Sequence, residues 1–481
     1  MPRGLRSRVA LGGPPALAAL ALQLANCGGL GASANHAGPG NDASVGGADG
    51  AASYGAASLC EGGVCPVATC LIDNPTTLTG KVFDPAGLNP LANVVVFVPS
   101  DPGSLPAIEQ GSPSCLLPTL GSYVVATDTN ASGAFTLTNV PTGSAVPLTV
   151  QIGKWRRTIT LPVANPCAMN PVADGTLRLP RNRSEGDLPQ IALLTGGADN
   201  LGCLLLGIGV DASEFGGPGS GASVDVYRGV GGASLADAAA GDCTGADCPL
   251  WNSPANLDAY DVVLLGCEGA ANLQTKPPMA MQSMHDWLAR GGKLFGVHEE
   301  DAWFSQGPAD FQAAATWVDG SASGATGPFV INTTAFPAGQ SFEEWANGNG
   351  AAAADAGLLL SPSDVATSVS AVGPTAAAWI FDESTAGTVD GSAFAGNVKA
   401  LTVAIPSTTD GSVPENSCGR ALLTDIHPGG MTPLSPVPSA CLGGGLGAEE
   451  KALEYLFFGE FLTVETPTCA CPPPPPPHSP Q

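Results

Sequence analysis

Between residues 78 and 161, short apolar runs alternate with turn residues. The runs are rich in β-branched and aromatic side chains, and Gly, Pro, Asn and Asp separate them, a pattern typical of short strands joined by turns. No run has the period of a helix. We therefore predict an antiparallel β-sandwich over residues 78–180. Its strands are predicted at Leu78–Phe83, Asn93–Val98, Tyr123–Thr127, Ala134–Leu137, Pro147–Ile152 and Arg157–Leu161.

From residue 188 onward, strand-like runs alternate with stretches of helical period. The clearest helix, Pro277–Arg290, begins at prolines and is followed by Gly291 and Gly292, the positions where helices favour these residues. Such alternation predicts a parallel sheet with helices on its faces, so we predict an α/β domain over residues 188–465. The other helices are predicted at Ala198–Val210 and Ala448–Phe458. The strands are predicted at Gln190–Thr195, Ser223–Tyr227, Asp261–Leu265, Lys293–Val297, Val398–Ile405 and Arg420–Ile426.

Residues 301–395 interrupt this alternation and are rich in loops. Two segments, TGPFVINTTAF and TAAAWIFD, have the composition of strands. Two interpretations stay open: a large insertion in the α/β domain, or a small separate β unit. The predicted fold class is multidomain, with an N-terminal antiparallel β-sandwich followed by an α/β parallel-sheet domain.

The two ends of the chain have simple compositions. Residues 1–26 combine arginines with a short apolar run, which predicts a signal peptide. The sequence Leu24-Ala25-Asn26-Cys27 resembles a bacterial lipobox, which implies lipidation of Cys27, although Asn26 departs from that motif and leaves plain secretion as the alternative. Residues 27–77 are predicted as a flexible tether with a Cys-rich linker, and residues 466–481 as a Pro-rich tail. We expect an exported cell-envelope protein that meets the membrane only through its lipid.

Charge narrows the range of partners. The formal net charge is -25, from 42 Asp and Glu against 17 Lys and Arg. Electrostatic repulsion argues against nucleic acid and anionic membrane surfaces as partners. A small-molecule or carbohydrate ligand is favoured, and the sequence does not determine the oligomeric state.

The 14 cysteines predict disulfides in an exported chain. If Cys27 is lipidated, an odd number remains, so at least one thiol is free or pairs with another chain. The pairs closest in sequence are the simplest to propose, and a zinc site is a weaker alternative for the first cluster because it lacks the C-x2-C spacing. The proposed pairs are Cys243 with Cys248, Cys418 with Cys441, and two among Cys60, Cys65 and Cys70.

The segments LTGKVFDPAGLNPLANVVVFV and TDTNASGAFTLTNVPTG resemble the carboxypeptidase regulatory-like domain. The resemblance implies a non-catalytic accessory module. The basic turn of residues 154–157 is predicted to dock on the acidic second domain, with a ligand-binding tip as the alternative. The matching positions are Asp128, Gly133, Phe135, Leu137, Val140, Pro141 and Gly143.

In the second domain, YDVVLL, a helix, GGKLFGVHE and the later GRALLTDIHP resemble the ThuA-like branch of the class I glutamine amidotransferase-like family. The resemblance covers residues 190–300 and 395–460. Working amidotransferases have a cysteine in a G-x-C-x-G elbow and a late H-P-E motif. Here the elbow carries His298 and the late motif is His427-Pro428-Gly429, so glutamine hydrolysis should be absent.

Residues that could take part in binding or catalysis follow the predicted parallel strands. The carboxyl ends of these strands are expected to meet at one edge of the sheet, where open α/β sheets place their ligands. Two histidines with nearby carboxylates suit a sugar or a divalent metal ion. The metal ligands would be His298, Glu299 and His427. The alternative without a ligand is that His298 ends its strand and is hydrogen-bonded to Glu299 or a backbone carbonyl. Cys267 is interpreted as buried or disulfide-bonded rather than nucleophilic, because the acids around it would raise its pKa. The catalytic candidates are Cys267, Glu268, His298 and Glu299, and the ligand-binding candidates are His298, Glu299, Glu300, Asp425 and His427.

Together these features resemble bacterial surface lipoproteins without an assigned reaction. The leading hypothesis is a non-catalytic envelope lipoprotein whose degenerate amidotransferase-like domain binds a ligand such as carbohydrate, without a cofactor. The second is a metal-dependent hydrolase that uses His298, Glu299 and His427. The third is a structural or adhesion protein.

Overall fold

The computed structural model describes residues 67–70, 74–115, 118–235, 241–321, 325–334, 336–353, 357–383, 397–406, 417–430, 436–441 and 445–461. The predicted signal peptide, lipidated Cys27, tether, Cys60, Cys65 and Pro-rich tail lie outside these residues. No helix in the described ranges is both long and apolar enough to cross a membrane.

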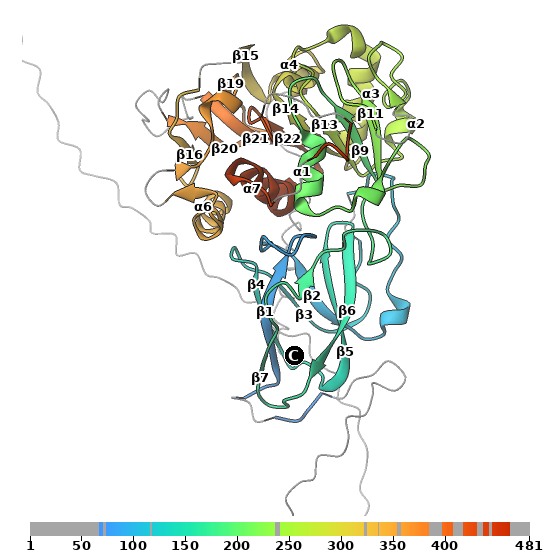
Figure 1. Ribbon diagram of the computed structural model, residues 1–481, viewed down its shortest axis with the longest axis vertical. Coiled ribbons are helices and arrows are strands. Elements are labelled where there is room, and N and C mark those ends of the chain that lie inside the picture. Colours follow the sequence, from blue (N-terminus) through green and yellow to red (C-terminus); the bar gives the residue numbers. More distant parts are fainter. Residues whose placement is uncertain are drawn as a thin grey trace, which may run out of the picture. The chain divides into compact units, whose positions relative to one another are not determined.

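Two four-stranded sheets form the N-terminal part (Figure 1). Apolar residues of both sheets, such as Leu78, Val96 and Leu148, belong to one hydrophobic cluster. One sheet is antiparallel throughout, with the order β3 (Tyr123–Asp128), β2 (Val95–Pro99), β5 (Gly143–Ile152) and β6 (Trp155–Val163).

The other N-terminal sheet is mixed, which corrects the expectation of an entirely antiparallel sandwich. Strand β1 (Thr77–Phe83) is antiparallel to β4 (Ala134–Thr138). It is parallel to β7 (Met169–Pro171) and β8 (Leu177–Arg178). The sequence pattern missed β7 and β8, because two or three residues are too few to show a period of two.

A large 14-stranded mixed sheet forms the second part. One half is a parallel run in the order β10-β11-β9-β13-β14-β22. Strand β9 lies between β11 and β13, so the strand order reverses at β9. In open α/β sheets, ligands bind at the carboxyl ends of the strands beside such a reversal. The bounds are β9 (Ile191–Thr195), β10 (Phe215–Gly216), β11 (Val224–Arg228), β13 (Val262–Leu265), β14 (Lys293–Val297) and β22 (Gly419–Thr424), and β12 (Gly241–Asp242) pairs with β11.

The other half of this sheet is antiparallel and answers the open question about residues 301–395. Strand β21 (Asn397–Ile405) pairs antiparallel with β22. The described strands of the 301–395 segment continue the same sheet beyond β21 rather than forming a sheet of their own. They are β15 (Ala315–Ser321), β16 (Phe329–Ile331), β17 (Ala352–Ala353), β18 (Gly357–Leu358), β19 (Thr367–Val372) and β20 (Ala376–Asp382).

Alternate residues of the parallel strands face two hydrophobic clusters. In β9, Leu193 packs in the cluster that contains α1 and α7, and Leu194 packs in the cluster that contains α3 and α4. Helices therefore cover both faces of the parallel run, as the strand–helix alternation predicts. The helices are α1 (Leu201–Ile208), α2 (Pro254–Leu257), α3 (Pro278–Ala289), α4 (Ala302–Ser305), α5 (Ala309–Gln312), α6 (Pro337–Asn349) and α7 (Ala448–Tyr455).

Four disulfides join described cysteines and indicate a location outside the cytoplasm. The predicted Cys243–Cys248 pair is confirmed. The predicted Cys418–Cys441 pair is wrong. Cys70 pairs with neither Cys60 nor Cys65, and a Cys60–Cys65 pair lies outside the described residues. The other three bridges are Cys70–Cys167, Cys115–Cys418 and Cys203–Cys441. These three bridges join segments 97, 303 and 238 residues apart in sequence, separations whose closure cost rises only slowly with loop length.

The basic turn between β5 and β6 contacts the α/β part, as predicted. Lys154 forms an ion pair with Asp261, which directly precedes β13. The indole of Trp155 meets the ring of Phe458 edge-on, with centroids 5.7 Å apart.

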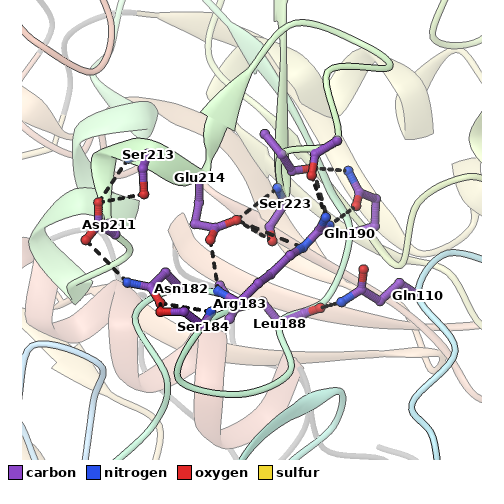
Figure 2. Close-up of polar contacts among 12 residues, drawn as sticks. Gln110, Asn182, Arg183, Ser184, Leu188, Gln190, Asp211, Ser213, Glu214 and Ser223 are labelled. Carbon is purple, nitrogen blue, oxygen red and sulfur yellow. Dashed lines mark hydrogen bonds and ion pairs between the residues drawn. The ribbon is translucent and has the colours of Figure 1, made fainter.

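The segment that joins the two parts is held by polar contacts (Figure 2). Arg183 donates to the side chain of Gln190, and its backbone N–H donates to Glu214. Glu214 in turn accepts a hydrogen bond from the Ser223 hydroxyl, just before β11.

Candidate functional site

The end of β14 bends sharply at His298. This residue has φ of +46° and begins a 3-10 turn, His298–Asp301, directly after the strand. A positive φ is rare outside glycine and costs conformational energy, so such residues cluster at functional sites. The bend turns the imidazole toward the end of β13, and only 6% of His298 is exposed.

The turn after β9 also lies close to the end of β13. A Cβ added to Gly196 would lie 2.1 Å from the carbonyl oxygen of Cys267, so only glycine fits there. Asp199 accepts a hydrogen bond from the backbone N–H of Cys267. Burial raises the pKa of this carboxyl to about 7. The turn after β9 therefore fixes the position of the cysteine.

Three buried side chains converge at this edge: Cys267, His298 and His427. One donor atom from each lies within 4.8 Å of the donor atoms of the other two. The thiol sulfur of Cys267 is 3.7 Å from Nδ1 of His298, and the two imidazole centroids are 5.3 Å apart. Among the described cysteines, Cys267 is free and buried, so the disulfide alternative for it does not hold.

The orientation of His427 is set by its neighbours. Its Nδ1 lies 3.0 Å from the carbonyl oxygen of Ala198, so Nδ1 carries the proton and Nε2 keeps its lone pair. The following loop is held by Asn200, which donates to Gly429 O, and by Glu450, which accepts from Gly429 N–H. Within the described part of the chain, the Nε2 atoms of His427 and His298 are buried without a hydrogen-bond partner.

Burial also decides the protonation of the three groups. It lowers the pKa of both His298 and His427 to about 4, and the like charge of the other imidazole adds to this at His427. Burial, assisted by Asp199, raises the pKa of the Cys267 thiol. Near neutral pH the imidazoles are neutral and the cysteine is a thiol. A cysteine nucleophile needs the opposite shifts, a lowered thiol pKa and a basic histidine.

The predicted carboxylates lie at different places around this cluster. Glu299 is the most exposed, with 23% of its side chain accessible, and its Oε1 is 3.9 Å from Nε2 of His298. Glu268 and Glu300 are buried and face Lys276, a residue that the sequence reasoning missed. The only sequence signal for Lys276 was a lysine isolated between a strand end and two prolines.

Asp425 lies beside the cluster rather than in it. It accepts hydrogen bonds from the backbone and the hydroxyl of Ser368. With His298, Asp301 and Lys399 it lines a small pocket. Burial raises the pKa of Asp425 and, to about 8, that of Asp301.

The fold and the site define an α/β protein with a buried Cys–His–His cluster at the carboxyl edge of its parallel sheet. Comparison of the chain with family models, with curated proteins and with solved structures gave no match.

Proposed function

We propose that the α/β domain binds one divalent transition-metal ion through Cys267, His298 and His427 and acts as a metal-dependent hydrolase. The observation that carries the proposal is the convergence of three buried ligand atoms within 4.8 Å, two of them on imidazoles whose Nε2 atoms lack a hydrogen-bond partner among the described residues. An unpaired buried polar atom costs free energy. A bound cation would satisfy these atoms.

The donor set suits zinc or a similar ion. Thiolate and imidazole are its usual protein ligands. The bond from His427 Nδ1 to the Ala198 carbonyl matches the outer-shell contact that orients metal-ligating histidines. A metal would also offset the raised pKa of Cys267, because coordination favours the thiolate.

Three protein ligands with an open fourth position are typical of catalytic zinc, which activates a bound water. In hydrolysis, water supplies a hydroxyl to the electrophilic carbon and a proton to the leaving group. Glu299 is the partly exposed carboxylate next to His298 and would accept the proton from water. This ligand set differs from the one expected from sequence: Cys267 takes the place of Glu299, which becomes the general base.

The family resemblances fit this proposal in a limited way. The strand order around β9 and the bend at His298 are compatible with an amidotransferase-like domain that has lost its elbow cysteine. The N-terminal sheets would then be the regulatory-like accessory module. Carbohydrate binding without catalysis is the alternative. Two imidazole Nε2 atoms lie close together and lack a hydrogen-bond partner among the described residues, and this favours a metal ion over a sugar.

The test is metal content and affinity of the full chain, purified with its disulfides intact and without reductant. We expect near-stoichiometric zinc in the parent and none in a variant with His298→Ala and His427→Ala. His285→Ala is the matched control, because His285 contacts Asp286 and Asp310 rather than the cluster. Equal and negligible metal in all three proteins would refute the metal site and redirect attention to sugar binding.

The hydrolase step needs its own measurement. The metal-loaded parent is assayed on a panel of esters, amides and glycosides. We expect turnover that chelation abolishes, that added zinc restores and that Glu299→Gln lowers by roughly 100-fold or more, in line with the contribution of a general base. Turnover that survives chelation would contradict the metal-dependent mechanism.

A further inference from the structure

A second buried cluster, formed by Lys276, Glu268 and Glu300, includes residues that follow Cys267 and His298 in the chain. The ammonium of Lys276 is 2.6 Å from Oε2 of Glu268 and 3.5 Å from Oε1 of Glu300, and it donates to the carbonyl oxygen of Ala271. The three charged side chains are at most 1% exposed. The structure therefore places two buried acidic side chains against one ammonium, and burial raises the pKa of Glu300 to about 8.

Stability does not explain this cluster. Removing a charged group from water costs several kcal/mol, and apolar residues of the same volume often serve as well or better. Its value must lie in what it positions. Glu268 directly follows Cys267 in the chain, and Glu300 is the second residue after His298. One ammonium thus joins the two chain segments that present the thiol and the imidazole.

Other hydrogen bonds extend this cluster to neighbouring elements. The second oxygen of Glu268 accepts from the backbone N–H of Val230, which lies beyond the end of β11. The second oxygen of Glu300 accepts from the indole of Trp303 in α4. The segment around Lys276 is itself held, because the indole of Trp251 donates to the carbonyl oxygen of Thr275. Glu268 thus links the carboxyl ends of β11 and β13, and Lys276 links Glu268 to Glu300 after β14.

We infer that Lys276 is a positioning residue for the metal site: by joining Glu268 to Glu300 it holds Cys267 and His298 at the separation that one metal ion requires. The inference rests on the proposed metal site. It assigns Lys276 no contact with the metal or a substrate.

The test is a titration of the full chain with Co²⁺, whose bond to a thiolate gives a charge-transfer absorption. We expect the parent to show that absorption at one equivalent. Lys276→Met should weaken Co²⁺ affinity by roughly 10–100-fold, the usual effect of losing an outer-shell partner, and should reduce the thiolate absorption at saturation. Lys293→Met is the matched control, because Lys293 is also buried but lies at the amino end of β14.

Lys276→Met leaves two buried carboxylates without their cation, so a second variant guards against misfolding. It combines Lys276→Met with Glu268→Gln and Glu300→Gln, which removes the charges together and keeps oxygen acceptors for Val230 and Trp303. We expect it to fold, as judged by near-UV circular dichroism, and still to bind Co²⁺ more weakly than the parent.

The outcomes separate the two proposals. A parent without the thiolate absorption would overturn the metal site itself. Parent-like affinity and spectrum in the folded triple variant would overturn the role of Lys276 and leave the metal site standing. Equal weakening by Lys293→Met would also overturn it, since the effect would then follow from the loss of any buried lysine.

Discussion

The two edges of the parallel run differ in how they use buried polar groups. At the amino edge, Lys293 donates to the carbonyl oxygen of Cys418. Asp261 accepts from Lys154 and from the backbone N–H of Gln190. At the carboxyl edge, the Nε2 atoms of the two converging histidines lack a hydrogen-bond partner among the described residues. The buried polar groups of the amino edge are thus paired, and one pair, Asp261 with Lys154, attaches the N-terminal part, whereas the carboxyl edge leaves two imidazole nitrogens without a hydrogen bond.

Burial alone therefore does not identify a functional site. Lys293 and Lys276 are both buried. The ammonium of Lys293 donates to the carbonyl oxygen of Cys418, whereas that of Lys276 forms ion pairs with Glu268 and Glu300, which follow two different strands. What distinguishes the carboxyl edge is convergence from several strands, which follows from the parallel direction of β9, β13, β14 and β22. If the two edges are energetically independent, a substitution at one edge should leave the behaviour of the other unchanged.

The largest expected effect concerns the pH dependence of stability at Lys293. Burial lowers the pKa of this ammonium from 10.5 to about 7. Between pH 7 and 10.5 the unfolded chain therefore binds more protons than the folded chain, so the free energy of unfolding rises with pH in this range. Below pH 7 the burial of the charged ammonium costs its full destabilising free energy. The gap corresponds to about 5 kcal/mol at about 1.36 kcal/mol per pKa unit.

We therefore expect Lys293→Met to gain stability relative to the parent at pH 6, and to lose that advantage progressively as pH rises from 7 toward 10. Urea unfolding at several pH values measures the difference. A difference that stays constant with pH would show that Lys293 is charged in the folded protein.

The next effect is at the junction between the two parts. Trp155 is fully buried against Phe458, so Trp155→Ala should lower the free energy of unfolding by about 3–5 kcal/mol. Metal affinity should stay at the parent value, because the indole does not contact the carboxyl-edge cluster. Chemical unfolding and Co²⁺ titration of the same sample check both statements, and a loss of affinity would show that the two edges are coupled.

Cys267→Ala should have the reverse profile. Without the thiolate, the Co²⁺ charge-transfer absorption should disappear and metal affinity should fall. The free energy of unfolding of the metal-free protein should change by less than about 2 kcal/mol, because the removed sulfur leaves only a small cavity. Absorption spectra and urea unfolding provide the test. An unchanged spectrum would remove Cys267 from the ligand set.

The smallest effect is expected at an exposed ion pair. Arg290 and Asp258 pair near the amino edge, and more than 40% of each side chain is exposed. Arg290→Ala should cost about 0–1 kcal/mol, because water screens such pairs, and should leave metal binding unchanged. A loss above 2 kcal/mol would indicate that the pair contributes more than its exposure allows.

The fold was predictable where the sequence pattern is local. Apolar runs such as those of β9, β13 and β14 fit strands buried on both faces, and Pro277 with Gly291 marks the limits of α3. The pattern failed for the two-residue strand β8. The choice of the nearest cysteine, Cys441, as the partner of Cys418 was also wrong, because the length of the closed loop constrains disulfide pairing only weakly.

The order of strands and helices along the chain, the excess of acidic residues and the histidines after two strands could be read from the sequence. The convergence of Cys267 with His298 and His427, and the contacts of Lys276 with Glu268 and Glu300, emerge only in the folded protein. The physical reason is that side-chain convergence depends on strand order in the sheet and on the sharp bend at His298. Both arise from contacts between residues far apart in the chain, which no local pattern encodes.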